Sequence, residues 1–514
     1  MTTMNPLRIL FRTDANQQIG TGHFMRCLTL ADEMRRSNAV ICFVARALPL
    51  HLQQMLTERG FKYLALPQPK ATQDTDELPH AAWLTTSQAH DAEQTLAALG
   101  VGTWDWLLVD HYSLDHRFEK PLRAVCQHVM VIDDLADRVH DCDVLLDQNF
   151  YQDQAQRYLD KVPAHCRLML GPSFALLRPE FKAMRDKMQV RSGKVNNILV
   201  FFGGVDADNL TGQVLEVLIS MNLPVQVNVV IGQLHPQKEK IEKICFQHGY
   251  ACHVQTGQMA RLMAEADLAI GAGGTTVWER FCLGLPSVCI ATADNQRQQL
   301  TDLQDAGLLI ATTDSADSKD FLKQTIAKLM KTGSYLQGLS QRGAAFVDGA
   351  GVCQVLAVLK AQMLHIRLAN IHDSPHIFNW RNHPQIRSIS SNAQAISWSD
   401  HTQWFDKRLR SEHGPLLIGE IRGQAIGVVR FDIHESSAEV SIYLVPDSGL
   451  KGWGSLLLIH AESWLQRHFP QIVTLQAKVL PDNEPSKKMF AKLNYVAIET
   501  HTPLEYVKAV ETCT

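Results

Sequence analysis

The chain has 514 residues, of which 46% are hydrophobic and 20% are charged, and its formal net charge is −4. This length exceeds a single hydrophobic core and indicates about three domains, while the small net charge and the lack of a long Lys or Arg run argue against a nucleic-acid-binding protein. The 11 cysteines form no C-x-x-C pair, so we interpret them as free thiols of a reducing compartment rather than zinc ligands. Because the N-terminus lacks the apolar core of a signal peptide and no apolar run approaches the span of a bilayer, we expect a cytoplasmic protein without membrane insertion.

Residues 5–185 alternate predicted strands with predicted helices. The runs "LRILFR" and "AVICFVAR" are typical of strands, and "GHFMRCLTLADEMRR" and "HLQQMLTERG" are typical of helices. Three later apolar runs, "WDWLLVDHY", "HVMVIDDLA" and "CDVLLDQN", each end in polar residues. This alternation predicts a parallel sheet with crossover helices, and ligands bind at the carboxyl ends of such strands.

Residues 194–362 repeat this pattern after a charged connecting stretch. "NNILVFFGG" and "VQVNVVIG" are predicted strands, "ADLAIGAGGTTVWERFCLGLPSVCIA" is a predicted strand–turn–helix–strand unit, and a helix closes the region near residue 362. We therefore expect an α/β fold of two Rossmann-like lobes of the GT-B type, facing each other across a cleft. Asp206 and Asp208 form a D-x-D sequence like the metal-binding motif of other transferases. We interpret them as structural or polar-contact residues and expect no metal.

Residues 364–510 predict a different, α+β domain. The segment "PLLIGEIRGQAIGVVRFDIHESSAEVSIYLVP" indicates strands joined by hairpins, with "RGQ" as a turn. A glycine-bearing loop, a helix, another strand and another helix follow.

A histidine follows two glycines in the first lobe, in the sequence "IGTGHFMRCLTLADEM". Gly20 and Gly22 allow close approach of a ligand to the backbone, and the helix after them directs amide donors at the cleft. Because a third glycine is missing, this is not a dinucleotide-binding fingerprint, and we exclude a dehydrogenase. His23 is either a capping or packing residue of the helix or a catalytic group at the mouth of the cleft.

The second lobe carries a candidate diphosphate site in "GAGGTTVWERFCLGLPSV". Amides and hydroxyls can bind a diphosphate where a helix begins, and a carboxylate one turn later can accept both hydroxyls of a ribose. The alternative is an ordinary strand–helix turn with a surface glutamate. The candidate UDP-binding residues are Gly273, Gly274, Thr275, Thr276, Glu279, Asn295 and Gln296.

Several stretches together resemble the UDP-sugar hydrolases of the pseudaminic-acid pathway, which release UDP from UDP-2,4-diacetamido-2,4,6-trideoxy-β-L-altropyranose. They are "RTDANQQIGTGHFMRCLTLA", "AAWLTTSQAHDAEQT", "WLLVDHY", "VIDDLADRVHDCDVLLDQN", "GPSFALLRPEF", "FFGGVDADNLT" and "GAGGTTVWERFCLGLPSV". The resemblance covers roughly residues 7–360. It implies that the second lobe holds UDP and that His23 is the general base.

This assignment agrees with the chemistry of the reaction. UDP leaves readily once amides neutralise its developing charge, so no strong general acid is needed, and an imidazole suits the activation of water near neutral pH. We expect C–O cleavage with inversion at C1. Arg12, Asp14, Gly20, Gly22, Asp110 and Tyr112 are candidates for binding the sugar or orienting His23.

The last region resembles the GNAT acetyltransferases, in which acetyl-CoA lies between two splayed strands. The resemblance rests on "IYLVPDSGLKGWGSLLLIHAESWL" and "LQAKVLPDNEPSKKMFAKLNYVAIE", while "IFNWRNHPQIRSIS" and "ISWSDHTQWFDKRL" resemble the pathway's N-acetyltransferase, which acts on the 4-amino group of a UDP-sugar. It implies acetyl-CoA as co-substrate. The implied acetyl-CoA-binding residues are Leu444, Val445, Gly452, Gly454, Asn483 and Ser486.

Two positions depart from the acetyltransferase pattern. Gly449 stands where a glutamine or arginine is usual, and Phe490 stands where a tyrosine often protonates the leaving thiolate. Either another acid serves, with Tyr443 and Tyr495 as candidates, or the domain has lost activity. Because positioning of the amine and thioester provides most of the rate, we favour an active domain.

The sequence thus predicts an enzyme for two consecutive steps, N-acetylation at C4 and then release of UDP, with UDP-amino sugars as substrates. Other enzymes of the pathway are candidate partners. One alternative is a glycosyltransferase that passes the sugar to an acceptor other than water. A further alternative treats the last domain as a non-catalytic, acyl-CoA-binding regulator.

Overall fold

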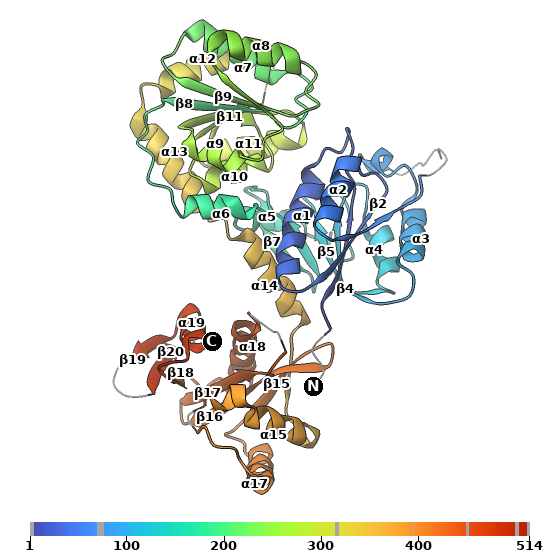
Figure 1. Ribbon diagram of the computed structural model, residues 1–514, viewed down its shortest axis with the longest axis vertical. Coiled ribbons are helices and arrows are strands. Elements are labelled where there is room, and N and C mark those ends of the chain that lie inside the picture. The colour runs from blue at the N-terminus through green and yellow to red at the C-terminus, as the bar shows by residue number, and fades with distance from the viewer. Residues whose placement is uncertain are drawn as a thin grey trace. The chain divides into compact units, whose positions relative to one another are not determined.

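The computed structural model describes residues 5–68, 77–313, 318–390, 392–448, 452–498 and 503–510 (Figure 1). The chain forms two compact units. The two-lobed unit is Pro6–Val355, and the C-terminal unit is Leu356–Thr514 together with Met1–Asn5.

The first lobe is built on a parallel sheet with the order β3-β2-β1-β4-β5-β6-β7. Its strands are β1 (Arg8–Thr13), β2 (Val40–Ala45), β3 (Lys62–Ala65), β4 (Trp104–Asp110), β5 (Cys126–Ile132), β6 (Val144–Asp147) and β7 (Arg167–Leu170). Its helices are α1 (Gly22–Arg36), α2 (Leu50–Glu58), η1 (Ala81–Trp83), α3 (Gln88–Leu99), α4 (His116–Leu122), α5 (Gln154–Arg157) and η2 (Pro172–Phe174). Every residue of β4 is buried, as expected for a central parallel strand covered on both faces.

The second lobe follows α6 (Pro179–Arg185) and has a parallel sheet with the order β10-β9-β8-β11-β12-β13. Its strands are β8 (Asn197–Phe201), β9 (Gln226–Ile231), β10 (Ala251–Val254), β11 (Leu268–Ala272), β12 (Ser287–Ile290) and β13 (Ile310–Thr312). Its helices are α7 (Leu210–Met221), α8 (Lys238–His248), α9 (Met259–Glu265), α10 (Thr276–Cys282), α11 (Asn295–Asp305), α12 (Ser318–Leu329), α13 (Gly333–Phe346) and α14 (Gly351–Met363). In Figure 1, α7, α8 and α12 lie on one side of this sheet and α9, α10 and α11 on the other, each set over its own hydrophobic core.

The D-x-D sequence of this lobe has a structural role at Asp206. The Asp206 carboxylate accepts hydrogen bonds from the backbone amides of Leu210 and Thr211, each at 2.9 Å, and so caps the start of α7. His235 Nε2 lies 3.2 Å from the same carboxylate, and Asp208 is exposed.

One apolar stretch is longer than the sequence led us to expect. By length and composition, residues 333–363 would suffice to cross a membrane, so the expectation that no apolar run approaches that span is wrong for this stretch. The structure forms two helices here, α13 and α14, separated at residues 347–350. Leu336 and Leu339 of α13 are buried, and Gly343 packs against Phe281 of α10. The core helix of a soluble protein can be as long and as apolar as a membrane-spanning helix.

The C-terminal unit has a mixed sheet with the order β14-β15-β16-β17-β18-β20-β19. Its strands are β14 (His365–Leu368), β15 (Leu416–Ile421), β16 (Gln424–His434), β17 (Ser437–Leu444), β18 (Thr474–Val479), β19 (Val496–Ile498) and β20 (Leu504–Ala509). Its helices are η3 (Ile371–Asp373), α15 (Ser374–Asn382), α16 (Pro384–Arg387), α17 (Trp398–Leu409), α18 (Trp453–His468) and α19 (Glu484–Lys492). The predicted "RGQ" turn is confirmed, because Arg422 and Gly423 have φ values of 52° and 70° and close the hairpin between β15 and β16.

Strands β17 and β18 separate after a short parallel pairing. Ser437–Glu439 pair with Thr474–Gln476, and the paired register ends there. The second half of β17 therefore bonds to β16 alone. Two parallel Rossmann-like sheets followed by this mixed sheet confirm the predicted fold class.

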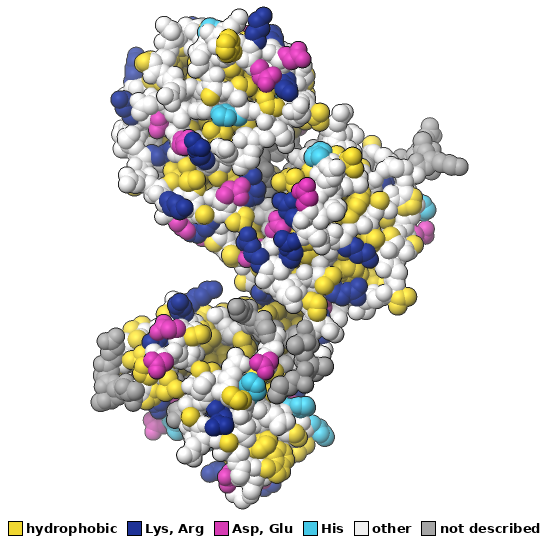
Figure 2. Space-filling model, viewed as in Figure 1, with side chains coloured by type: hydrophobic (Ala, Val, Ile, Leu, Met, Phe, Trp, Pro, Cys, Tyr) yellow, Lys and Arg dark blue, Asp and Glu magenta, His cyan; other side chains and the backbone are white. Residues whose placement is uncertain are grey.

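The visible surface agrees with the weak net charge. On the face in Figure 2, basic and acidic side chains are interspersed among the residues that the structure describes, with no broad patch of one sign.

Candidate functional site

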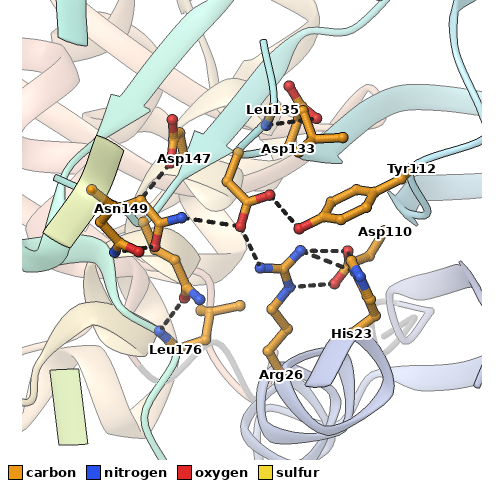
Figure 3. Close-up of polar contacts among 12 residues, drawn as sticks. His23, Arg26, Asp110, Tyr112, Asp133, Leu135, Asp147, Asn149 and Leu176 are labelled. Carbon is orange, nitrogen blue, oxygen red and sulfur yellow. Dashed lines mark hydrogen bonds and ion pairs between the residues drawn. The ribbon is translucent and has the colours of Figure 1, made fainter. Parts of the chain in front are cut away.

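His23 lies at the start of α1, where the first lobe faces the second. Thr21 is the N-cap of this helix, so His23 does not cap it. The imidazole is 8% exposed, and its Nδ1 lies 2.6 Å from Oδ1 of the fully buried Asp110 at the end of β4 (Figure 3). The structure thus brings together two of the predicted residues, and the contact through Nδ1 leaves Nε2 as the second nitrogen of the ring.

Arg26 completes this array from the same face of α1, three residues after His23. Its Nε and Nη2 donate to the two carboxylate oxygens of Asp110, both at 2.6 Å. Burial opposes ionisation of Asp110, but the charge and hydrogen bonds of Arg26 and His23 outweigh it and hold the pKa of this carboxyl below its usual range. Asp110 is therefore a charged partner for His23.

Aromatic side chains border His23. The ring of Tyr112 stands edge-on to the imidazole at 4.5 Å, and Trp83 stacks on Tyr112 at 5.6 Å. The Tyr112 hydroxyl donates to Asp134 Oδ1 at 2.5 Å. Burial, followed by the charge of Asp134, raises the pKa of Tyr112 well above its usual value, so the phenol stays protonated.

Two cavities adjoin in the cleft and share lining residues. The smaller, about 150 Å³, is lined by His23, Arg26, Ile19, Gly22, Tyr112, Asp134, Asn149, Tyr151, Gly274, Thr275, Asn295, Gln296 and Gln299. The larger, about 310 Å³, includes Gly22, Arg26, Arg178, Gln255, Thr256, Met259, Thr275, Thr276 and Glu279. The two cavities adjoin, because Gly22, Arg26 and Thr275 line both of them. His23, Gly22, Tyr112 and six of the seven predicted UDP-binding residues line this space, and Gly273 is the exception.

The glycines of the second-lobe loop are explained by its geometry. Gly274 has a φ of 79°, which side chains rarely adopt. A Cβ on Gly273 would lie 3.0 Å from Gln296 Oε1. The loop therefore packs closely on α11 while Thr275 and Thr276 face the cavities.

Glu279 lies on α10 in the larger cavity. Burial raises its pKa to about 7, although Arg178, whose Nη2 is 3.6 Å away, opposes the shift. Its carboxylate therefore titrates near neutral pH, in the place where the sequence predicts contact with ribose hydroxyls.

Two predicted substrate-binding residues lie in the protein interior and line neither cavity. Arg12 is fully buried and pairs with Asp14 at 2.9 Å and with Asp91 at 2.9 Å. Asp14 also lies 3.1 Å from His111 Nε2 and accepts the backbone amide of Arg46. Neither side chain lines the cleft, because each is engaged in this buried ion network. Gly20 has a φ of 75° and shapes the loop before α1.

Sequence reasoning missed several side chains of the cleft. The missed residues are Ile19, Arg26, Asp134, Asn149, Tyr151, Arg178, Gln255, Thr256 and Gln299. Arg26 had a detectable signal, since residues three apart share a helix face. Asp134 and Asn149 follow predicted strands, the position where open α/β sheets collect ligand contacts. Among the described residues, no group of three or more His, Cys, Asp or Glu is arranged to hold a metal ion.

The C-terminal unit places its six predicted acetyl-CoA residues around the separation of β17 and β18. Leu444 ends β17, and Val445 follows it. Gly452 has a φ of 83° at the N-cap of α18, and a Cβ on Gly454 would lie 3.2 Å from Met489 Sδ. Asn483 caps α19 by accepting the backbone amide of Ser486. Gly449 lies outside the described residues.

A cavity of about 420 Å³ opens beside β16 and β17. It is lined by Ile377, Arg381, Ser390, Asn392, Ile396, Asp400, His401, Trp404, Leu416, Val428, Arg430, Ser441 and Tyr443. Burial raises the pKa of Tyr443, with Arg381 and Arg430 opposing the shift, so its phenol stays protonated. Tyr495, the other candidate acid, faces elsewhere, because its hydroxyl donates to Glu462 at 2.7 Å. Phe490, at the usual tyrosine position, is buried against Tyr506.

The comparisons with known proteins match the two-lobed unit and the C-terminal unit to different families. Residues 197–350 match the model of the glycosyltransferase family 28 C-terminal domain, and residues 363–496 match that of the acetyltransferase (GNAT) domain. Uncharacterized protein MJ1062 of Methanocaldococcus jannaschii is 24% identical over 95% of this chain and 96% of its own length.

Two relatives from Campylobacter jejuni each match one part of the chain. UDP-2,4-diacetamido-2,4,6-trideoxy-β-L-altropyranose hydrolase is 24% identical over 59% of this chain and 97% of its own length. Acetyltransferase PseH is 26% identical over 26% of this chain and 82% of its own length. The chain therefore joins two Rossmann-like lobes, the second of which is similar to the glycosyltransferase family 28 C-terminal domain, to a domain that is similar to the GNAT acetyltransferases.

Proposed function

We propose that the two-lobed unit hydrolyses UDP-2,4-diacetamido-2,4,6-trideoxy-β-L-altropyranose to the free sugar and UDP. The observation that carries this proposal is that His23, paired with the charged Asp110, lines the same cavity as Gly274 and Thr275. With a base on one lobe and a diphosphate site on the other, C1 of a bound UDP-sugar would lie between the two groups, where the reaction takes place. The similarity of this region to the Campylobacter jejuni hydrolase supports the choice of substrate.

The proposed reaction uses the second ring nitrogen of His23. With Nδ1–H donated to Asp110, Nε2 keeps a lone pair and accepts a proton from water. The water oxygen attacks C1 from the face opposite UDP, the C1–O bond breaks, and its electron pair leaves on the β-phosphate oxygen. Amides and hydroxyls of the Gly274–Thr275 loop stabilise that charge. The free sugar forms with inversion at C1.

We propose that the C-terminal unit acetylates the 4-amino group of the precursor UDP-sugar. The separated strands β17 and β18 offer the place for acetyl-CoA, and the cavity beside Tyr443 offers the place for the amine. The amine nitrogen attacks the thioester carbonyl, the new N–C bond forms as the C–S bond breaks, and the Tyr443 hydroxyl protonates the leaving thiolate. The nitrogen loses one proton to solvent, and Tyr443 regains a proton from solvent. Tyr443 is the proposed acid, because Phe490 has no ionisable proton and the hydroxyl of Tyr495 is hydrogen-bonded to Glu462.

One experiment tests both steps. The whole protein receives the UDP-4-amino-4,6-dideoxy sugar with and without acetyl-CoA, and NMR follows UDP and the anomeric products. We expect UDP release only with acetyl-CoA, and the α or β configuration of the first product reports inversion. Equal UDP release without acetyl-CoA would contradict the sequential scheme. With the diacetamido substrate, no UDP release in the absence of a sugar acceptor would favour a glycosyltransferase.

The Tyr443→Phe variant separates catalysis from binding in the C-terminal unit. We expect acetyl transfer to fall about 10- to 100-fold, because general acid catalysis is lost, while the affinity for acetyl-CoA is retained. Binding of acetyl-CoA by the unchanged protein without any transfer would instead favour the regulatory alternative.

We also propose a reducing, cytoplasmic location for the protein. Every cysteine that the structure describes is free, which supports this location.

A further inference from the structure

The amide of Asn149 joins the two lobes beside the proposed reaction centre. Asn149 follows β6 in the first lobe and is only 7% exposed. Its Oδ1 accepts hydrogen bonds from Trp278 Nε1 at 3.3 Å and from Gln299 Nε2 at 3.1 Å. Both donors belong to the second lobe, on α10 and α11, which flank the candidate UDP loop.

The other end of the same amide points toward His23. Asn149 Nδ2 donates to Asp134 Oδ2 at 3.1 Å, and that carboxylate also accepts the Tyr112 hydroxyl and lies 3.6 Å from Arg26 Nη1. Arg26 in turn holds Asp110, the partner of His23. Figure 3 shows this line of contacts running from His23 through Arg26 toward Asn149.

The orientation of the amide is fixed by these partners. The second lobe offers only donors to Oδ1, and Asp134 is a carboxylate that needs a donor from Nδ2. The backbone amide of Asn149 also donates to Asp147 Oδ1 at 2.9 Å. A side chain so fully engaged has little capacity left for a substrate, so its role is exerted through Asp134.

We infer that Asn149 is a positioning residue that aligns the His23–Asp110–Arg26–Asp134 array with the UDP-binding lobe. This inference rests on the proposed hydrolase function. Misplacement of reacting groups by about 1 Å can lower a rate about 100-fold. UDP itself is held by the second lobe, so its affinity does not depend on this alignment.

The test compares Asn149→Asp with unchanged protein, using UDP-2,4-diacetamido-2,4,6-trideoxy-β-L-altropyranose. The aspartate still accepts from Trp278 and Gln299 but repels Asp134 instead of donating to it. We expect kcat for UDP release to fall about 10- to 100-fold, with the affinity for UDP by calorimetry within about 2-fold of the unchanged protein.

A reciprocal double variant provides the rescue. In Asp134→Asn with Asn149→Asp, the donor and acceptor exchange places, and residue 134 can still accept from Tyr112. We expect the double variant to recover kcat at least about 3-fold over Asn149→Asp alone, because the bond between the two positions is restored. Gln299→Glu removes the donor to Asn149 Oδ1 in the second lobe. This variant should lose kcat to the same extent as Asn149→Asp.

Asp302→Asn is the matched control. Asp302 also bridges the lobes, accepting the backbone amide of Gln152 at 3.2 Å, but it does not contact the array. We expect kcat to stay within about 2-fold. The inference is overturned if Asn149→Asp and Gln299→Glu match this control, or if they lower kcat and UDP affinity together without rescue. Absence of UDP release by the unchanged protein would overturn the hydrolase function itself.

Discussion

The two lobes share one topology but place different chemistry at equivalent strands. Strands β1 and β4 hold the same sheet positions in the first lobe as β8 and β11 hold in the second. After β1 and β4 come the titratable groups His23 and Asp110, which pair in the cleft. After β8 and β11 come Asp206, which caps α7, and a Gly-Gly-Thr-Thr loop without an ionisable side chain. The same backbone arrangement thus carries a paired histidine and aspartate in one lobe and a glycine- and threonine-rich loop in the other.

Substitution of His23, the proposed base, should have the largest effect on the rate of UDP release. His23→Asn keeps a hydrogen-bonding side chain but cannot accept a proton from water, so we expect kcat for UDP release to fall about 10²- to 10⁴-fold. The affinity for UDP should not change, because the second lobe remains intact. Steady-state UDP release and calorimetry check both values. Acetyl transfer by the same variant is the internal control, and retained hydrolysis would remove His23 as the base.

Glu279 is an ionisable side chain of the second lobe that lines the cleft, a few residues after the Gly-Gly-Thr-Thr loop. Its pKa, raised to about 7, predicts that the carboxylate is mostly ionised at pH 8 and mostly protonated at pH 6. Under the proposed UDP site, the ionised carboxylate accepts the ribose hydroxyls, so the affinity for UDP should weaken about 5- to 10-fold as the pH falls from 8 to 6. Calorimetric titration of UDP across this range measures the effect.

The control for this prediction is Glu279→Gln, which cannot ionise. It should weaken UDP binding about 10-fold at pH 8 and leave only the pH dependence that belongs to UDP itself. A Glu279→Gln profile parallel to that of the unchanged protein would exclude Glu279 as the titrating group.

The smallest effect should come from Asp147, which ends β6 near the junction of the lobes. Burial, followed by the charge of Asp134, raises the pKa of Asp147 to about 8. Since the unfolded carboxyl titrates near its usual value, the folded state binds the additional proton between these two pH values, and stability falls as the pH rises through about 8. Asp147→Asn removes this loss, so its melting temperature should exceed that of the unchanged protein by about 2 °C at pH 9 and by less at pH 6.

Thermal unfolding in the two buffers checks the prediction. The quantity to compare is the melting-temperature gain of Asp147→Asn at pH 9 against its gain at pH 6. An effect of the substitution on packing alone would change both gains equally. A melting-temperature difference that is the same at pH 6 and pH 9 would contradict the raised pKa.

The sequence predicted the sheets and the loops of the cleft better than it predicted the contacts. Hydrophobic runs located β1, β4, β8 and β11, since buried parallel strands are continuously apolar. The loops at His23 and Gly274 were found because glycines mark close approach. Arg12 and Asp14 were grouped with the cleft because they lie at the end of β1. The sequence does not show that Asp91 of α3 and His111 after β4 pair with them in the interior. Asn149 was missed because its two partners lie 129 and 150 residues away.

The separation of β17 and β18 leaves an unusual feature inside the last sheet. Beyond Glu439, the side of β17 that faces β18 pairs with no strand among the described residues, so it forms an internal edge of the sheet. The pantetheine arm of acetyl-CoA carries two amide groups and can bond to such an edge as a short additional strand would. Under the proposed acetyl-CoA site, the co-substrate therefore completes the sheet, and its binding should also protect the C-terminal unit from edge-to-edge association.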